Sequence, residues 1–261
     1  ASHGNAGLIV PSHSVPLAEP AALAQGLRYL FQPDSPFYIK PRLDADLLRW
    51  LWRFRRAATP ARVQRAIPVL RNLHRASRKL YAAFADELAD FGYGERGRVL
   101  VCDTEEGLQE AREEGHHMRA AGLETEELDD AGVSRALGDL TVCCKGGLSY
   151  TEDAHLDPAR FVRILAQRAQ EAGVEIIECA EVLHIDSRRR QVGTIDTTRG
   201  AFQARQLVLA AGSWSPPVAA GLGLDLPIQP AKGYSVEIDA PADAPDVPFM
   251  LTEARVAVTP L

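Results

Sequence analysis

The sequence predicts a mixed α/β (α+β) fold, in which a parallel sheet covered by helices is combined with an antiparallel sheet. Amphipathic helical segments alternate with short apolar runs along the 261 residues, and one helix leads through Gly173 directly into such a run. Later in the chain, residues 228–238 and 247–258 have the character of antiparallel strands. Hydrophobic residues make up 46% of the chain and charged residues 25%, so it can bury an ordinary globular core.

The first segment of the chain predicts loops followed by a helix. Prolines punctuate residues 1–43, where we expect only a short helix at about 21–31. Asp44 is a suitable N-cap for a helix that reaches Arg56.

Thr59-Pro60 has the form of a second helix start, because proline is favoured at the first helical position. Apolar residues then recur every three or four positions: Leu70, Leu73, Leu80, Phe84, Leu88 and Phe91. This spacing predicts an amphipathic helix that faces a core. We expect Pro68 to kink or restart this helix, and Gly92 and Gly94 to end it.

The middle of the chain predicts a strand, a helix and a mixed segment. Residues 98–103 form an apolar run typical of a strand, and Thr104 then caps a helix that extends to about Ala121. Residues 123–150 are expected to contain another short helix and a strand near 147–150.

The last hundred residues begin with a helix start at Asp157-Pro158, and we expect Gly173 to end that helix. Several strands are predicted to follow: 174–178, 181–186, 191–197 and the apolar run 207–211. The run 207–211 has the pattern of a strand that is buried on both faces.

Residues 26–80 carry 13 Lys and Arg against three Asp, a local charge of +10 in a chain of net charge −6. Trp50, Trp52 and Phe54 are interleaved with these cations. Three interpretations stay open: a solvated face balanced by the acidic stretch 103–130, a surface for a membrane or protein partner, and a nucleic-acid surface. The first two are favoured, and we expect no nucleic-acid partner.

The four cysteines form no CxxC pair, and the histidines have no metal-ligand spacing, so we expect reduced thiols and no metal site. The chain has no apolar run of about 20 residues and no signal-peptide pattern, which favours a cytoplasmic location. It begins without Met and ends in the apolar run 256–261, from which we expect truncation at both ends.

Two segments are candidates for ligand binding. After the predicted strand 207–211, the small residues Ala210, Ala211 and Gly212 would let a ligand approach the backbone. Residues 2–7 contain two glycines whose backbone N–H groups can face a phosphate. From the residues alone, simple turns without a ligand are the favoured interpretation of both segments, and neither GxGxxG nor GxxxxGK[ST] occurs in the chain.

Several motifs in one order and register resemble the D-amino-acid dehydrogenases, which belong to the D-amino-acid oxidase/glycine oxidase superfamily of FAD enzymes. They are Gly4-Asn5-Ala6-Gly7-Leu8-Ile9, Ser35-Pro36, Trp50-Leu51-Trp52, Gly146-Gly147-Leu148, His155-Leu156-Asp157-Pro158, Ala210-Ala211-Gly212-Ser213-Trp214-Ser215 and Pro230-Ala231-Lys232-Gly233-Tyr234-Ser235. The resemblance implies part of an FAD domain of the glutathione-reductase type, formed by residues 1–43 and 150–225. It also implies part of a helical substrate domain with an antiparallel sheet, formed by residues 44–149 and 226–261.

The resemblance further implies site residues. Those expected by the flavin or pyrophosphate are Ser2, Asn5, Ala6 and Gly7. Val182 would hold the adenine through its backbone, and Ala210, Ala211, Gly212 and Trp214 would line the FAD groove. Tyr234 is expected to face the substrate.

The activity implied is oxidative deamination of a small amino acid, with hydride transfer from the α-carbon to flavin N5. Alternatives are a D-hydroxyproline, proline, glycine or sarcosine oxidoreductase, or a truncated fragment without activity. The electron acceptor implied is a respiratory chain or quinone, which would suit peripheral contact of residues 44–80 with the inner face of the plasma membrane.

Overall fold

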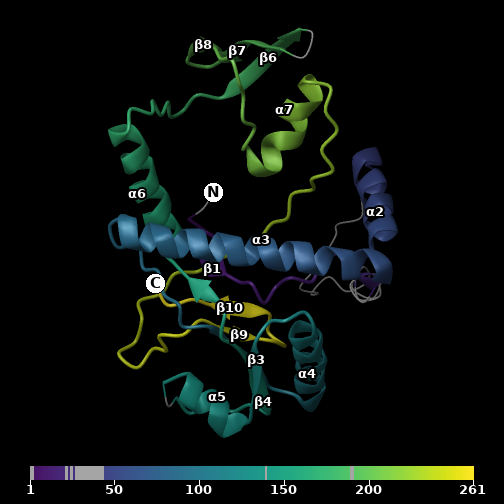
Figure 1. Ribbon diagram of the computed structural model, residues 1–261, viewed down its shortest axis with the longest axis vertical. Helices are drawn as coiled ribbons and strands as arrows, with labels where there is room; N and C mark the ends of the chain where they lie inside the picture. The colour runs from purple at the N-terminus through teal and green to yellow at the C-terminus, as the bar shows by residue number, and fades with distance from the viewer. Residues whose placement is uncertain (1–2, 21–22, 24–25, 27–43, 139, 189–190) are drawn as a thin grey trace. The chain divides into compact units, whose positions relative to one another are not determined.

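A computed structural model describes residues 3–20, 23, 26, 44–138, 140–188 and 191–261. The fold is mixed α/β, as predicted, and forms two compact units. The first unit comprises residues 1–40, 55–168 and 234–261, and the second comprises residues 41–54 and 169–233 (Figure 1). The helix predicted at 21–31 lies outside the described residues, apart from residues 23 and 26. No helix in the described part of the chain is both long and apolar enough to cross a membrane.

The first unit contains a five-stranded sheet in the order β10-β9-β2-β4-β3. Its strands are β2 (Arg98–Cys102), β3 (Thr125–Leu128), β4 (Gly146–Tyr150), β9 (Phe249–Leu251) and β10 (Val256–Val258). β2 runs parallel to β9, and the other neighbouring strands are antiparallel. The strand character predicted for residues 247–258 is therefore confirmed as the β9–β10 hairpin.

Helices α4 (Glu105–Ala120) and α5 (Asp130–Ala136) contribute to different cores on this sheet. Leu100 of β2 shares a core with Met118 of α4, whereas Val101 shares one with Val133 of α5. Because side chains of a strand alternate between its faces, β2 is buried on both sides, which explains its continuous apolar run. The Thr104 hydroxyl accepts a hydrogen bond from the backbone N–H of Gly107, 3.0 Å away, and so caps α4 as predicted.

A third core in the same unit joins β1 (Leu8–Ile9), β5 (Ala154–His155), α3 (Pro60–Glu87) and α6 (Pro158–Glu171). β1 and β5 are antiparallel partners. The ring of Phe161 packs against three other aromatic rings, with centroid distances of 5.0–5.7 Å to Phe91, Tyr81 and Phe84. The carboxylate of Asp157 accepts a hydrogen bond from the Arg160 backbone N–H, which confirms the predicted start of α6.

Helix α3 differs from its prediction in three respects. It runs without a break through Pro68, it ends at Glu87 so that Phe91 lies beyond it, and Leu73 and Leu80 are 62% and 61% exposed. Pro68 is exposed, so the carbonyl deprived of its N–H partner can face water and the helix need not end there. Only the C-terminal part of the predicted apolar stripe joins the core, through Phe84, Leu88 and Phe91.

The second unit contains most of α2 (Ala45–Ala57), a three-stranded antiparallel sheet and a short helix. The sheet has the order β6-β7-β8, formed by β6 (Val182–Arg188), β7 (Gln191–Thr197) and β8 (Gly200–Gln203). A 3₁₀ turn, η1 (Gly212–Trp214), leads into α7 (Ser215–Gly221), which packs against β6. The predictions of α2 and of the β6–β7 pair are confirmed.

Three predicted strands do not form: residues 174–178, 207–211 and 228–238. Val208, at the centre of the run expected to be buried, is 86% exposed. An isolated extended segment gains no ladder hydrogen bonds, and no described strand pairs with any of these three segments. The predicted parallel sheet is therefore absent from the described residues, where β2 and β9 are the one parallel pair.

Candidate functional site

A cavity of about 390 Å³ lies in the first unit, within the size range of small-molecule sites. It is bounded by the segment around β1, by α3 and by the start of α6. Its lining residues are Asn5, Gly7, Leu8, Ile9, Val10, His74, Ser77, Tyr81, Leu156, Pro158, Phe161 and Val162. Two of the residues predicted to lie near the flavin, Asn5 and Gly7, are among them.

The backbone at Gly7 fixes one wall of this cavity. The Asn5 side-chain oxygen accepts a hydrogen bond from the Gly7 N–H at 3.0 Å, and the Gly7 carbonyl accepts one from the Leu156 N–H at 2.9 Å. Gly7 has a φ of +68°, and an added Cβ would lie 2.1 Å from the Leu156 carbonyl oxygen. Only glycine fits here, because both the backbone conformation and the space exclude a side chain.

Three polar or aromatic side chains of α3, which the sequence analysis missed, also line this cavity. His74, Ser77 and Tyr81 follow one another at helical spacing and line the cavity together. The His74 Nδ1 lies 3.4 Å from the hydroxyl of Ser14. The available signal was the presence of His74 and Ser77 among the apolar positions of the α3 stripe.

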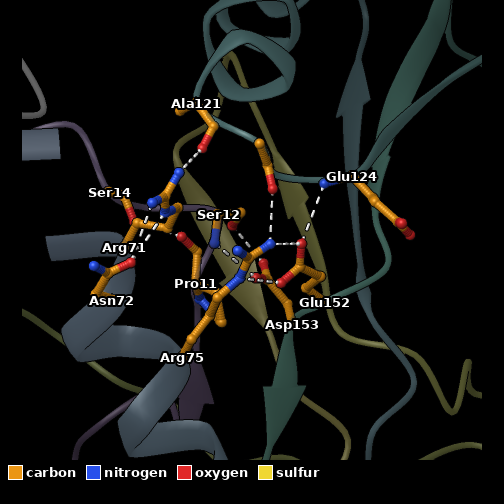
Figure 2. Close-up of polar contacts among 11 residues, drawn as sticks. Pro11, Ser12, Ser14, Arg71, Asn72, Arg75, Ala121, Glu124, Glu152 and Asp153 are labelled. Carbon is orange, nitrogen blue, oxygen red and sulfur yellow. Dashed lines mark hydrogen bonds and ion pairs between the residues drawn. The ribbon is translucent and has the colours of Figure 1, made fainter. Parts of the chain in front are cut away.

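Arginines of α3 hold the helix in place beside the cavity (Figure 2). Arg75 donates to both carboxylate oxygens of Glu152, at 2.7 and 2.6 Å, and to the Gly122 carbonyl at 2.7 Å. Arg71 donates to the Ala121 carbonyl. The hydrogen bond from Arg75 lowers the pKa of Glu152, so this carboxylate stays charged at neutral pH.

His155 lies in β5, directly beside the cavity-lining strand β1. Its backbone is paired with Leu8 and with Gly94, and its side chain is buried. Burial, and next the positive charge of Arg96, lower the pKa of the His155 imidazole, so the neutral form prevails at neutral pH.

The second unit holds the other predicted FAD contacts. Val182 begins β6, the edge strand of its sheet, and α7, which follows Trp214, packs against this strand. Gly212 has a φ of +54°, and a Cβ added there would meet nothing within 4 Å. Residues 210–212 are therefore small residues at the start of a turn, with open space beside Gly212, and do not form the end of a buried strand.

A second cavity of about 550 Å³ lies in this unit, between α2 and the segment from Pro216 to Gln229. Arg53 and Asp225 form an ion pair across it at 2.5 Å. Their mutual hydrogen bond raises the pKa of Arg53 and lowers that of Asp225.

The predicted site residues thus lie in both units. Asn5, Ala6 and Gly7 lie in the first, and Ser2 is outside the described residues. The second unit contains Val182, Ala210, Ala211, Gly212 and Trp214. Tyr234 lies in the first unit, where it is 88% exposed and lines neither cavity. In the described part of the chain, no group of three or more His, Cys, Asp or Glu residues is placed to hold a metal ion.

Each of the two segments, taken by itself, leaves space beside its backbone for a ligand. At residues 5–10, a cavity of cofactor-site size lies against a backbone that admits only glycine at position 7. At residues 210–212, small side chains and the open space at Gly212 allow close approach of a large ligand to the backbone. The edge strand β6 leaves backbone groups on one side free of ladder partners among the described strands.

Comparisons with known proteins agree with FAD as the expected cofactor. Residues 1–260 match the DAO family, described as FAD dependent oxidoreductase. A D-amino acid dehydrogenase from Cereibacter sphaeroides is 33% identical over 266 residues, which cover 100% of this chain and 61% of that protein. Another from Sinorhizobium medicae is 32% identical over 269 residues, covering 100% of this chain and 64% of that protein.

Among solved structures, glycine oxidase from Geobacillus kaustophilus matches with a TM-score of 0.56 and 28% identity, over 60% of this chain and 44% of that one. The chain spans somewhat over three fifths of the length of the curated relatives it matches.

Proposed function

Because the chain belongs to the DAO family of FAD-dependent oxidoreductases, we propose that the protein oxidatively deaminates small D-amino acids. The observation that carries the proposal is the match of the whole chain, at about one third identity, to proteins named D-amino acid dehydrogenase. The cavity at Asn5 and Gly7 supports it, because these two of the four residues expected by the flavin line a site within the size range of small-molecule sites.

FAD, when bound, supplies the acceptor for the hydride that leaves the substrate α-carbon. In this proposal the segment Ser2, Asn5, Ala6 and Gly7 holds the flavin or pyrophosphate. Val182 offers its backbone to the adenine, while Ala210, Ala211, Gly212 and Trp214 line the rest of the groove. Residues 1–43 and 150–225 then belong to the FAD-binding domain, and residues 44–149 and 226–261 to the substrate domain.

The chain's part in the reaction is to orient the substrate and exclude water from it. Tyr234 is proposed to face the substrate. Loss of the hydride and of an amine proton leaves an imine, and water hydrolyses this imine to a 2-oxo acid and ammonia.

A glycine- or sarcosine-type activity is the second candidate, because the glycine oxidase neighbour shares 28% identity and the fold. A proline or D-hydroxyproline substrate, or a chain that is inactive by itself, would also be compatible with the family. These candidates differ in which amino acid, if any, reduces the bound flavin.

The electron acceptor is proposed to be a respiratory chain or quinone, reached from the inner face of the plasma membrane. Helix α2 supports this, since Leu48 and Trp52 are 56% and 57% exposed on a helix with Arg55 and Arg56 in its last turn. Exposed apolar and basic groups on one helix suit an anionic membrane surface.

The first test of the proposed function is cofactor retention. The purified protein is mixed with FAD and desalted, and its visible absorption is recorded. Retained flavin in a one-to-one ratio is the expected result, and complete loss of flavin on desalting would contradict the proposal.

A further inference from the structure

The side chain of Asp153 is fully buried in the turn between β4 and β5, where it binds the loop that follows β1. The hydroxyl of Ser12 donates to Asp153 Oδ2 at 2.6 Å, and the Ser12 backbone N–H donates to Oδ1 at 3.1 Å. Ser12 is itself buried. A single carboxylate thus fixes both the backbone and the side chain of one loop residue.

Arg98, at the start of β2, supplies the balancing charge. Its Nε donates to Asp153 Oδ2 at 3.0 Å, and its Nη2 donates to the Ser12 hydroxyl at 3.0 Å. The guanidinium lies over the ring of Tyr150, 4.7 Å from the ring centroid. Ser12, Arg98 and Asp153 therefore form a closed triangle of hydrogen bonds, here called the Ser12 cluster.

The Ser12 cluster holds one end of the cavity wall. At the other end, the Gly7 carbonyl is bonded to the Leu156 N–H, and between the two points Leu8 and Ile9 pair with β5. The segment from Gly7 to Ser12 is therefore fixed at both ends. The hydrogen bonds to Asp153 and Leu156, which flank β5, therefore fix the position of its cavity-lining residues.

The neighbouring carboxylate, Glu152, binds different segments of the chain. Glu152 binds Arg75 of α3 and accepts from the Glu124 N–H at 3.3 Å, whereas Asp153 binds the β1 loop (Figure 2). Glu152 thus holds α3, which contributes none of the proposed FAD contacts, and this makes Glu152 a matched control for Asp153.

A buried ion pair is a poor source of stability, because desolvation offsets most of its attraction. Its directional bonds do, however, define one position for the groups that it joins. We propose that the Ser12 cluster is a positioning device for the cofactor: Asp153 and Arg98, acting through Ser12, set the segment Asn5–Val10 in the place that FAD binding requires. This inference rests on the proposed function and extends it to three residues outside the cavity lining.

The test uses S12A, which removes the loop's hydroxyl and leaves the Arg98–Asp153 pair intact, so the protein is expected to fold. S12T retains the hydroxyl, and E152Q is the control at the neighbouring carboxylate. Amide hydrogen exchange of the protein without added FAD is measured at residues 8–12, and FAD affinity is measured by flavin fluorescence.

We expect S12A to speed exchange at residues 8–12 and to weaken FAD binding at least tenfold. S12T should restore binding to within threefold of wild type, and E152Q should alter exchange in α3 and at Glu124 with FAD affinity within threefold of wild type.

Unchanged exchange at residues 8–12 in S12A would overturn the inference, as would faster exchange with unchanged FAD affinity. An equal loss of affinity in S12A and E152Q would also overturn it, because the effect would then follow general loosening of the cavity. Wild-type protein that binds no FAD would contradict the proposed function. That result is distinguishable from failure of this inference, in which wild type and S12A bind FAD equally well.

Discussion

Gly7 is the residue on which the cavity wall depends most directly. Gly7→Ala would require a side chain in the left-handed region and place its Cβ against the Leu156 carbonyl. We expect a loss of about 1–3 kcal/mol in the free energy of unfolding. We also expect FAD affinity to fall at least tenfold, because the wall that carries Asn5 must move. Urea unfolding and an FAD titration measure the two effects.

Gly138→Ala is the matched control for this substitution. Gly138 has a φ of +78°, but an added Cβ would meet nothing within 4 Å. Gly138→Ala should therefore lower the free energy of unfolding by about 1 kcal/mol, through its backbone conformation alone. Its FAD affinity should equal that of wild type. Equal FAD affinities of Gly7→Ala and wild type would contradict the role given to Gly7.

His155 predicts a pH dependence of stability. Burial lowers the pKa of His155 in the folded protein, so the unfolded chain takes up this proton first as the pH falls through its ordinary value of 6.5. Below about pH 6.5 the unfolded chain therefore binds more protons than the folded protein, and further acidification favours unfolding. For this one group the free energy of unfolding falls by up to about 1.4 kcal/mol per pH unit. His155→Gln should flatten the curve of unfolding free energy between pH 5 and 6.5.

His184→Gln provides the comparison, because His184 is an exposed histidine of β6. Its curve should follow that of wild type. A slope in His155→Gln as steep as in wild type would show that other groups cause the acid destabilisation.

At the scale of elements, local signals in the sequence predicted helices well. Thr104 and Asp157 accept backbone hydrogen bonds at the starts of α4 and α6, as their positions indicated. Such caps depend on residues three positions apart, so the sequence contains all the information they need. The β6–β7 pair was predictable for the same reason, because its two strands are joined by a short turn.

Strands that need distant partners could not be predicted in this way. The run 207–211 has the apolar composition of a buried strand, yet no described strand pairs with it and Val208 is exposed. Composition records a tendency to be buried, whereas pairing depends on segments elsewhere in the fold. His74 and Ser77 could not be predicted for a similar reason, because no local pattern shows that α3 lines the same cavity as Gly7.

Pro68 gives a prediction for α3 itself. In the helix interior it removes one backbone hydrogen bond and crowds the preceding turn, at a cost of up to about 3 kcal/mol. Pro68→Ala should therefore raise the free energy of unfolding by at least about 1 kcal/mol, measured by urea denaturation. Pro60→Ala, at the first helical position where proline is tolerated, should raise it less. Equal free energies of unfolding in Pro68→Ala and Pro60→Ala would contradict the claim that proline destabilises the interior of α3 at position 68.

Helix α2 gives the prediction for membrane contact. Trp52→Glu and Leu48→Glu should each reduce cosedimentation with anionic phosphatidylglycerol vesicles at least threefold, because they place charge on its exposed apolar groups. Leu165→Glu, at an exposed apolar position of α6, is the control and should bind as wild type does. Wild-type protein that stays in the supernatant at low salt would contradict the proposal.

At the scale of the whole molecule, the proposed FAD contacts come from sequence positions more than 170 residues apart and from both compact units. Asn5 and Gly7 line a cavity in the first unit, while the turn at 210–214 leads into α7, which packs against the strand that begins at Val182 in the second. The order of motifs along the chain is what predicts this set of contacts.

The most direct test of the central claim is the anaerobic visible spectrum of the FAD-loaded protein after addition of single amino acids. We expect D-alanine and other small D-amino acids to bleach the flavin band, with release of ammonia and the matching 2-oxo acid, while L-alanine leaves the band unchanged. Bleaching by glycine, sarcosine or proline in place of D-alanine would keep the flavin enzyme and replace its substrate. A flavin that none of these amino acids reduces would contradict the account.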